Sequence, residues 1–360
     1  MLRVSQKVLI NDWMYILGIN AYHGDASACL LKNGIVICAI EEERIRRIKH
    51  WAGFPSEAIK FCLIDAGITI DDVDYITISR DPKVNLHKRI LHFLHYPTSV
   101  FYSWDRLRNI KKLTNLKHDL ANFFHTKDFN SIREKVFNIE HHRSHLASAF
   151  FASSFEKAAI LSIDGFGDFT STMTAVGKGN SFDVLGEVNY PHSLGILYTA
   201  VTQFLGFLNY GDEYKVMGLA PYGEPNYIQV LEKLVQVKEN GYFKLNSRYF
   251  RHFNEGISMN WNEGMPTVDL LFTDNWQKLF GEPRKKGEVL DSRHMNLAAS
   301  VQMLTEKIVF HILNKLYEKT GCENICIAGG IAQNSVMNGK IIANTPFKKV
   351  YVHALVRDEK

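Results

Sequence analysis

The clearest pattern in the chain is an arrangement of apolar and polar positions that occurs twice. Residues 15–40 begin with an apolar stretch, pass through a polar turn rich in Gly and Asp, and continue into a second and a third apolar stretch. Residues 158–189 repeat this order with a turn of similar composition. Short runs of small, apolar and β-branched residues separated by such turns are typical of antiparallel strands. We therefore expect two three-stranded meanders, the first with Asn33-Gly34 as a type I′ hairpin turn.

The stretches between and after these meanders show helical spacing. Pro55 opens one such segment and Gly67 ends it, and a longer segment with apolar positions from Leu297 to Leu316 ends at Gly321. Residues 222–290 lack clear periodicity. The remaining elements that we expect are strands at 75–78, 325–327 and 350–352, helices at about 143–155 and 193–208, and a loop at 211–218. Strands combined with crossover helices predict an α/β fold.

Length and repetition together predict two lobes. A chain of 360 residues is too long to fold around one simple hydrophobic core. Turns of the duplicated kind place backbone N–H groups and carboxylates where a phosphate or a metal can lie. We therefore expect a duplicated fold whose lobes face each other across a nucleotide cleft. The first lobe is expected at 15–157 and the second at 158–360, preceded by a disordered leader or misassigned start at 1–14.

Composition narrows the class of protein. The chain is 46% apolar and 22% charged, as in ordinary globular proteins, and has no apolar run long enough to span a membrane. Its start has no apolar segment typical of a signal peptide. The five cysteines form no CxxC pair, which favours buried free thiols and a cytoplasmic location.

Positive charge is concentrated in an apparent insertion at about 80–135. This segment contains 12 Lys and Arg against five Asp and Glu, together with several His and aromatic residues. Basic and aromatic content is one feature of nucleic-acid binding. We disfavour nucleic acid as a partner, because the bias is confined to the insertion and no known binding motif is present. A solvated helical insertion that steers anionic substrates is the preferred interpretation.

Two histidines stand four residues apart, at a predicted helix start, in His141-His142-Arg143-Ser144-His145. His141 and His145 therefore share one helix face and could bind one metal ion. Asp164, at the second Gly/Asp turn, would add a carboxylate. Two imidazoles and one carboxylate suit a divalent transition metal with open positions. The alternative is that His141 and His142 only cap the helix.

Several glycines and polar residues are candidates for binding a nucleotide. Glycines allow close approach of the backbone to a ligand, although a glycine pair after a strand is more often a tight turn. Lys215 lies in the predicted Gly-bounded loop, where most lysines are merely solvated. The candidates are Gly165, Gly167, Asp168, Lys215, Gly329, Gly330 and Asn334.

His23 is the candidate catalytic base. It lies on the first glycine turn with Asp25 close behind, and a carboxylate can polarise an imidazole so that it accepts a hydroxyl proton. The alternative is a histidine that only hydrogen-bonds a phosphate. The dense charge run at 41–50 closes the first meander, so we expect part of it to line the cleft.

The sequence resembles the O-carbamoyltransferases, a family that includes nodulation-factor and antibiotic-tailoring enzymes. The resemblance covers roughly residues 15–358. The segments that carry it, in chain order, are 18–28, 41–47, 141–150, 163–168, 214–220 and 328–334.

The resemblance implies an actin-like ATPase fold and a reaction in two stages. Family members make carbamoyl-adenylate from carbamoyl phosphate and ATP, and then pass the carbamoyl group to a hydroxyl of an acceptor. It also implies a metal, typically iron, held by His141, His145, Asp164 and Asp358. His23 matches the family's catalytic histidine. The implied acceptor is a sugar, polyol or other natural product.

The chain departs from the family pattern in two places. The residues around Asp358 lack the Pro and Gly of the family motif, and we expect the family's final helix to be missing as well. We also expect this chain to lack the family's second domain, which forms the adenylate, so a separate activating chain is an expected partner. Two alternatives remain: a non-catalytic nucleotide-binding remnant, and a relative of the tRNA threonylcarbamoyl transferases. A sugar kinase is a more distant option that the paired histidines disfavour.

Overall fold

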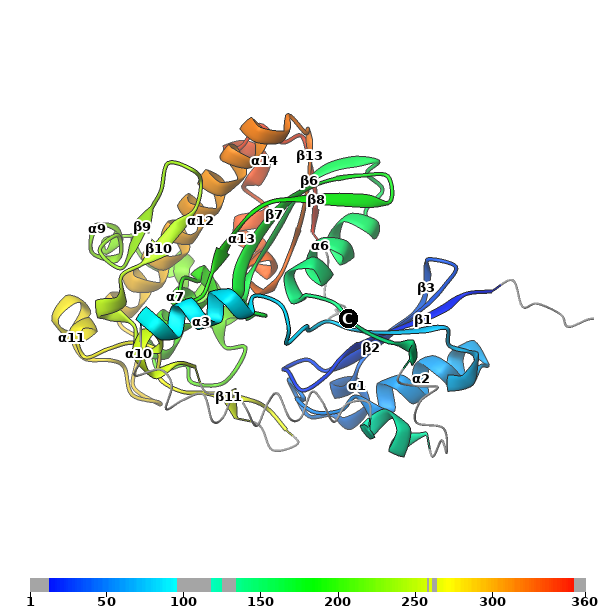
Figure 1. Cartoon of the computed structure of the whole chain (residues 1–360). Helices are drawn as coiled ribbons and strands as arrows, with labels where there is room; N and C mark the ends of the chain where they lie inside the picture. The colour runs from blue at the N-terminus through cyan, green and yellow to red at the C-terminus, as the bar shows by residue number, and fades with distance from the viewer. Residues whose placement is uncertain (1–12, 96–117, 125–133, 258, 261–263, 353–360) are drawn as a thin grey trace, which may run out of the picture. The chain divides into compact units, whose positions relative to one another are not determined.

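The described residues fall into two compact units in the computed structural model (Figure 1). The structure describes residues 13–95, 118–124, 134–257, 259–260 and 264–352. Within these, unit 1 contains residues 13–79, 118–124, 134–138 and 264–266. Unit 2 contains residues 80–95, 139–257, 259–260 and 267–352. These units follow contacts and not the order of the chain, so the boundary expected at residue 157 stays a prediction.

Unit 1 is built on a five-stranded sheet with the order β3-β2-β1-β4-β5. The three strands of the meander are antiparallel, and β4 and β5 then join β1 in parallel. Its elements are β1 (Tyr15–Asn20), β2 (Ser27–Lys32), β3 (Ile35–Glu41), α1 (Glu42–Arg46), α2 (Ser56–Ala66), β4 (Tyr75–Ile78) and β5 (Val136–Asn138). Asn33 and Gly34 both have positive φ, which confirms the predicted I′-type turn.

Unit 2 contains a second five-stranded sheet with the order β14-β13-β6-β7-β8. Here too a meander is antiparallel, and β13 and β14 join β6 in parallel. Its strands are β6 (Lys157–Gly167), β7 (Thr170–Lys178), β8 (Ser181–Asn189), β13 (Asn324–Ala328) and β14 (Lys349–Val352). The two sheets share strand order and strand direction. The duplicated actin-like α/β fold expected from the sequence is therefore confirmed.

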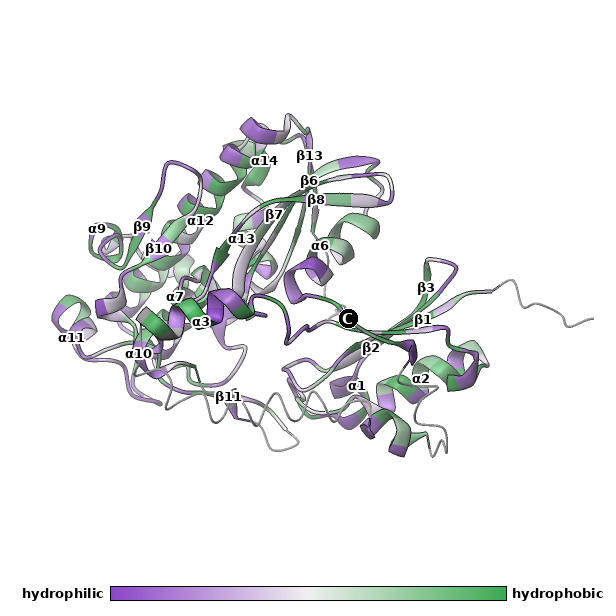
Figure 2. Ribbon diagram, in the orientation of Figure 1, coloured by the Kyte–Doolittle hydropathy of each residue, from purple (hydrophilic) through white to green (hydrophobic). Residues whose placement is uncertain are grey.

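Helices cover both faces of the second sheet. The main ones are α6 (His141–Phe151), α7 (Leu194–Phe204), α8 (Glu213–Leu219) and α12 (Ser292–Thr320). Alternate residues of β6 face opposite ways: Ala158 and Ile160 pack with α6, whereas Leu161 and Ile163 pack with α7 and α12. Figure 2 shows apolar and polar segments mixed along α12, as its sequence spacing predicted. The part of β6 that precedes Asp164, from Ala158 to Ile163, is therefore buried on both sides of the sheet.

Short elements make up the rest of unit 2. Residues 222–290, which lack periodicity, form α9 (Ile228–Leu231), β9 (Val235–Val237), β10 (Phe243–Leu245), α10 (His252–Glu255), β11 (Met259–Asn260), β12 (Thr267–Val268) and α11 (Asn275–Phe280). After β13 follow α13 (Ser335–Asn338) and α14 (Ile341–Asn344). In the described part of the chain, no helix is both long and apolar enough to cross a membrane.

The basic insertion is described only in part. Its first segment forms α3 (Leu86–His95), which belongs to unit 2 and is tied to β8 by an ion pair between Lys88 and Glu187. Residues 118–123 form a further helical segment in unit 1. Residues 96–117 and 125–133 lie outside the described residues, and so does most of the predicted insertion. Its proposed role in steering anionic substrates stays a prediction.

Two local predictions were wrong. The segment expected to be a loop at 211–218 is helical from Glu213 onwards, as α8. The turn expected at 164–168 begins later, because β6 continues through an irregularity to Gly167 and pairs it with Thr170. The turn itself consists of Asp168 and Phe169, which both have positive φ.

Glu42 shows that the charge run at 41–50 is not simply a solvated surface. Its side chain is fully buried and accepts hydrogen bonds from the backbone N–H groups of Glu57 (3.2 Å) and Ala58 (2.7 Å), at the start of α2. Arg46 Nε lies 2.6 Å from the same carboxylate. A negative charge at this position satisfies N–H groups that the helix itself cannot.

Replacing Glu42 by Ala should lower the free energy of unfolding by about 3 kcal/mol, because buried N–H groups and the Arg46 guanidinium lose their partner. Chemical denaturation followed by circular dichroism measures this change. Glu57→Ala is the matched control. The Glu57 carboxylate pairs with the half-exposed Lys60 at 3.1 Å and accepts the Ser56 hydroxyl at 3.4 Å, so its loss should change stability by less than about 1 kcal/mol. Equal effects for the two variants would contradict the capping role.

Candidate metal centre

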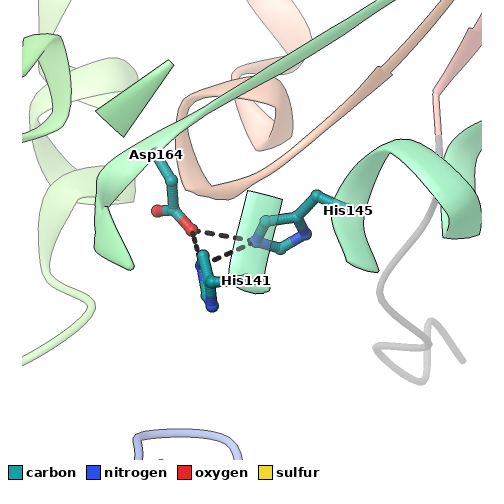
Figure 3. A group of neighbouring side chains, drawn as sticks. All are labelled: His141, His145 and Asp164. Atoms are coloured by element: carbon teal, nitrogen blue, oxygen red, sulfur yellow. Dashed lines mark hydrogen bonds and ion pairs between the residues drawn. The ribbon is translucent and has the colours of Figure 1, made fainter. Parts of the chain in front are cut away.

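Three of the predicted metal ligands come together in unit 2 (Figure 3). His141 is the first residue of α6, and His145 follows one helical turn later, on the same face. Asp164 lies on β6, directly after the buried part of that strand. The helix begins where it does because the Glu140 carboxylate accepts the backbone N–H groups of His142 (3.1 Å) and Arg143 (2.9 Å).

The ligand atoms have the spacing of a metal coordination shell. Nε2 of His145 lies 3.1 Å from Nε2 of His141 and 3.1 Å from Oδ2 of Asp164, and Nε2 of His141 lies 3.4 Å from the same oxygen. Ligands about 2.1 Å from one ion are separated by roughly 3.0–3.4 Å in octahedral or tetrahedral geometry. Two imidazole nitrogens and one carboxylate oxygen are a donor set suited to a divalent transition metal. The residues present therefore fit such an ion.

The charge of Asp164 is maintained by its neighbours. Burial alone would raise the pKa of this carboxyl, but hydrogen bonds from His141 and His145 and their charges hold it well below its usual range. Its other oxygen, Oδ1, accepts the backbone N–H of Gly165 at 2.7 Å. Oδ2 is therefore the oxygen that is presented, ionised, to the two imidazoles.

The middle histidine of the motif has a different role. His142 is completely buried, with Nε2 3.0 Å from the carbonyl of Thr170 and Nδ1 2.7 Å from Oγ of Ser162. A carbonyl can only accept, so Nε2 carries the proton and Nδ1 accepts from the Ser162 hydroxyl. Burial and the nearby histidine charges hold the pKa of His142 well below its ordinary value, which keeps it neutral. His142 thus ties α6 to the second sheet, and Glu140 caps the helix.

Two of the predicted nucleotide glycines make room for metal ligands. A Cβ atom on Gly167 would lie 2.0 Å from Cδ2 of His141, and one on Gly330 would lie 2.7 Å from Oδ1 of Asp164. Both positions therefore need glycine for the ligand side chains to occupy their places. A Cβ on Gly165 would meet no atom within 4 Å. Contact of these glycines with a nucleotide stays a prediction.

The other nucleotide candidates are engaged within the protein. Lys215 lies on α8, where Nζ is 2.6 Å from Oδ1 of Asp212. Asn334 is buried, exchanges hydrogen bonds with Gln302 (2.7 and 3.0 Å) and accepts the Met337 N–H to cap α13. Gly329 approaches β6 so closely that a Cβ there would lie 2.3 Å from the carbonyl of Ile163. Roles in nucleotide binding stay predictions for all three.

The remaining metal candidate, Asp358, lies outside the described residues. The candidate metal centre is therefore described with three of its four predicted ligands, and metal binding and the role of Asp358 stay predictions.

Asp25, expected to polarise His23, pairs with another histidine in unit 1. Oδ1 of Asp25 lies 2.8 Å from Nδ1 of His50, whereas Nδ1 of His23 lies 3.2 Å from the carbonyl of Gly24. The backbone N–H of His50 donates to Glu43 at 2.6 Å. Ligand atoms of Asp25, Glu43 and His50 all lie within 4.8 Å of one another. Sequence reasoning missed this cluster, whose only signal was the charge run that follows the first meander.

Residues 15–359 match the family model described as the carbamoyltransferase N-terminus. The uncharacterized protein sll1178 of Synechocystis is 40% identical over 96% of this chain and 55% of its own length. The nodulation protein NolNO of Sinorhizobium fredii is 33% identical over 94% of this chain and 45% of its own length. The chain belongs to the carbamoyltransferase family.

More distant similarities are also present. A tRNA N6-adenosine threonylcarbamoyltransferase of Acidovorax is 23% identical over 62% of the chain. Among solved structures, HypF of T. kodakarensis covers 95% of this chain at 12% identity, with a TM-score of 0.41, and 45% of HypF is covered in turn. The chain spans about half the length of the two curated relatives sll1178 and NolNO.

Proposed function

We propose that this chain is the transfer part of an O-carbamoyltransferase. The carbamoyl group would pass from carbamoyl-adenylate, made from carbamoyl phosphate and ATP, to a hydroxyl of a sugar or natural-product acceptor. Membership of the carbamoyltransferase family supports carbamoyl transfer. The observation that supports a reaction site in this chain is the clustering of the ligand atoms of His141, His145 and Asp164.

The proposed step is a substitution at the carbamoyl carbon. The acceptor oxygen forms a bond to that carbon, the bond from the carbon to the adenylate phosphate oxygen breaks, and AMP leaves. His23 is proposed to take the proton of the acceptor hydroxyl. His141, His145 and Asp164 are proposed to hold a divalent ion, Fe²⁺ being the first candidate, which would supply a Lewis acid for phosphate oxygens when bound.

Formation of the adenylate is proposed to need a part outside this chain. The relatives are about twice as long as the aligned region, so the activating step is assigned to a separate chain or a further domain. A cytoplasmic location is part of the proposal, since all five cysteines are free thiols.

A two-arm assay with iron and a panel of saccharide acceptors tests this function. One arm receives ATP and carbamoyl phosphate, and the other receives preformed carbamoyl-adenylate. We expect carbamoylated product, detected by mass spectrometry, only in the adenylate arm. A folded, metal-loaded sample without transfer in either arm would favour a non-catalytic nucleotide-binding remnant. A parallel reaction with tRNA and threonylcarbamoyl-adenylate tests the alternative shared with the Acidovorax relative, and product there would overturn the saccharide assignment.

The role of His23 has its own test in the adenylate arm. His23→Asn should lower the transfer rate by about 100-fold or more, since a general base typically contributes that much. Metal binding should be unchanged, because His23 is not among the three ligands. A rate equal to that of the wild type would show that another group accepts the proton.

A further inference from the structure

Asp168 is a buried carboxylate next to the metal centre that is not one of its three ligands. It forms the turn after β6 and is only 6% exposed. Its Oδ2 atom accepts the backbone N–H of His141 at 3.0 Å and the backbone N–H of Asp81 at 2.7 Å. Burial raises the pKa of this carboxyl, although these two N–H groups act in the opposite direction.

The N–H of His141 is one of those at the start of α6 that have no partner inside the helix. Glu140 accepts the next two, from His142 and Arg143, and the N–H of Ser144 donates to the carbonyl of Glu140. All N–H groups of the first turn of α6 therefore have an acceptor. For His141, the residue proposed to bind the metal, that acceptor is Asp168. This fixes the backbone from which the His141 imidazole extends.

Asp168 also fixes a second segment of unit 2. Besides the N–H of Asp81, the side-chain amide of Asn85 donates to the carbonyl of Asp168 at 3.0 Å. The chain enters unit 2 at Arg80 and again at Ile139. Asp81 and His141 follow these entries by one and two residues, so a single carboxylate oxygen fastens both segments.

We propose that Asp168 is a positioning residue of the metal centre. Its Oδ2 atom would hold the backbone of His141, the first residue of α6, and that of Asp81, and so set the place of the His141 imidazole. This inference rests on the metal centre of the proposed function and assigns Asp168 a role other than direct contact with a nucleotide. Groups that orient a ligand typically change metal affinity by about 10- to 100-fold when lost.

Cobalt binding to the whole chain tests the inference without any assay of activity. Co²⁺ affinity and the visible absorption spectrum of the bound ion are measured for the wild type, Asp168→Asn and Asp168→Ala. Alanine removes the acceptor, and the dissociation constant should rise about 10- to 100-fold. Asparagine keeps an acceptor oxygen but loses the charge, so its dissociation constant should rise roughly three- to tenfold. Both variants should shift the spectrum, because the imidazole of His141 changes its direction.

Asp291→Ala is the matched control. Asp291 accepts the N–H of His294 at 3.1 Å and caps α12, another helix of unit 2. This variant also loses a carboxylate that accepts a backbone N–H at a helix start. It should keep wild-type cobalt affinity and spectrum, which separates positioning of His141 from the general loss of such an acceptor.

The results distinguish a failure of the proposed metal centre from a failure of the positioning role of Asp168. If the wild type binds no cobalt, the metal centre itself is wrong. If the wild type binds cobalt and the folded Asp168 variants match it in affinity and spectrum, the positioning role is overturned while the metal centre stands. Should Asp168→Ala fail to fold, Asp168→Asn decides, and affinity within twofold of the wild type together with an unchanged spectrum would overturn the role.

Discussion

Asp164→Asn should abolish useful metal binding, with a loss of affinity of at least about 100-fold, more than expected for groups outside the ligand set. The reason lies in the two oxygens of the carboxylate. Oδ1 accepts the N–H of Gly165, so the single oxygen of an asparagine amide will take that position. The amide NH₂ then faces His141 and His145, where Oδ2 lies in the wild type. An NH₂ group has no lone pair for a metal, and the negative charge is lost as well.

Cobalt and iron titrations monitored by absorption and calorimetry measure this loss, and carbamoyl transfer from preformed adenylate should fall with it. Asp183→Asn is the control, since Asp183 is an exposed carboxylate on β8 of the same unit and its loss changes the net charge equally. If Asp164→Asn retained wild-type affinity, the three side chains would have to be a hydrogen-bonded cluster and not a metal centre.

The fold could be predicted from the sequence because the patterns that indicate it are formed by residues close together in the chain. Alternation of apolar residues, Asn33-Gly34 and the repeated meander need only neighbouring residues, and both sheets follow the predicted plan. The position of the turn after Asp164 could not be predicted from the sequence. Gly165 and Gly167 suggest a turn in isolation, but the structure continues β6 past them and keeps glycine at 167 because His141 packs there. That contact joins residues 26 positions apart in sequence.

In the candidate site, too, some features follow from local sequence and others only from tertiary contacts. Helical spacing is enough to predict that His141 and His145 share a face, and the Gly/Asp pattern identified Asp164. Which carboxylate meets which histidine depends on tertiary structure. Asp25 lies two residues from His23 but pairs with His50, and Glu42, within an apparent surface run, is buried as a helix cap. Neither pairing follows from spacing or composition.

Gly167→Ala should damage the metal centre without touching any ligand chemically. The new Cβ would lie 2.0 Å from Cδ2 and 2.1 Å from Cγ of His141, closer than any non-bonded contact allows. The backbone of His141 is held by Asp168, and Glu140 holds the following residues, so the imidazole has to rotate out of its place. One of three described ligands is then lost. We expect metal affinity to fall by about 100-fold, with overpacking costing about 1–3 kcal/mol of stability.

Gly165→Ala, two residues earlier on the same strand, makes this experiment decisive. A Cβ at this position meets nothing within 4 Å, so metal affinity should remain that of the wild type. Calorimetric titration of both variants compares the same substitution with and without a collision. Equal affinities would mean that His141 is not a ligand in the position described. If Gly165→Ala binds metal normally yet transfers carbamoyl slowly, the defect lies in another step, as expected if the backbone at Gly165 approaches the adenylate.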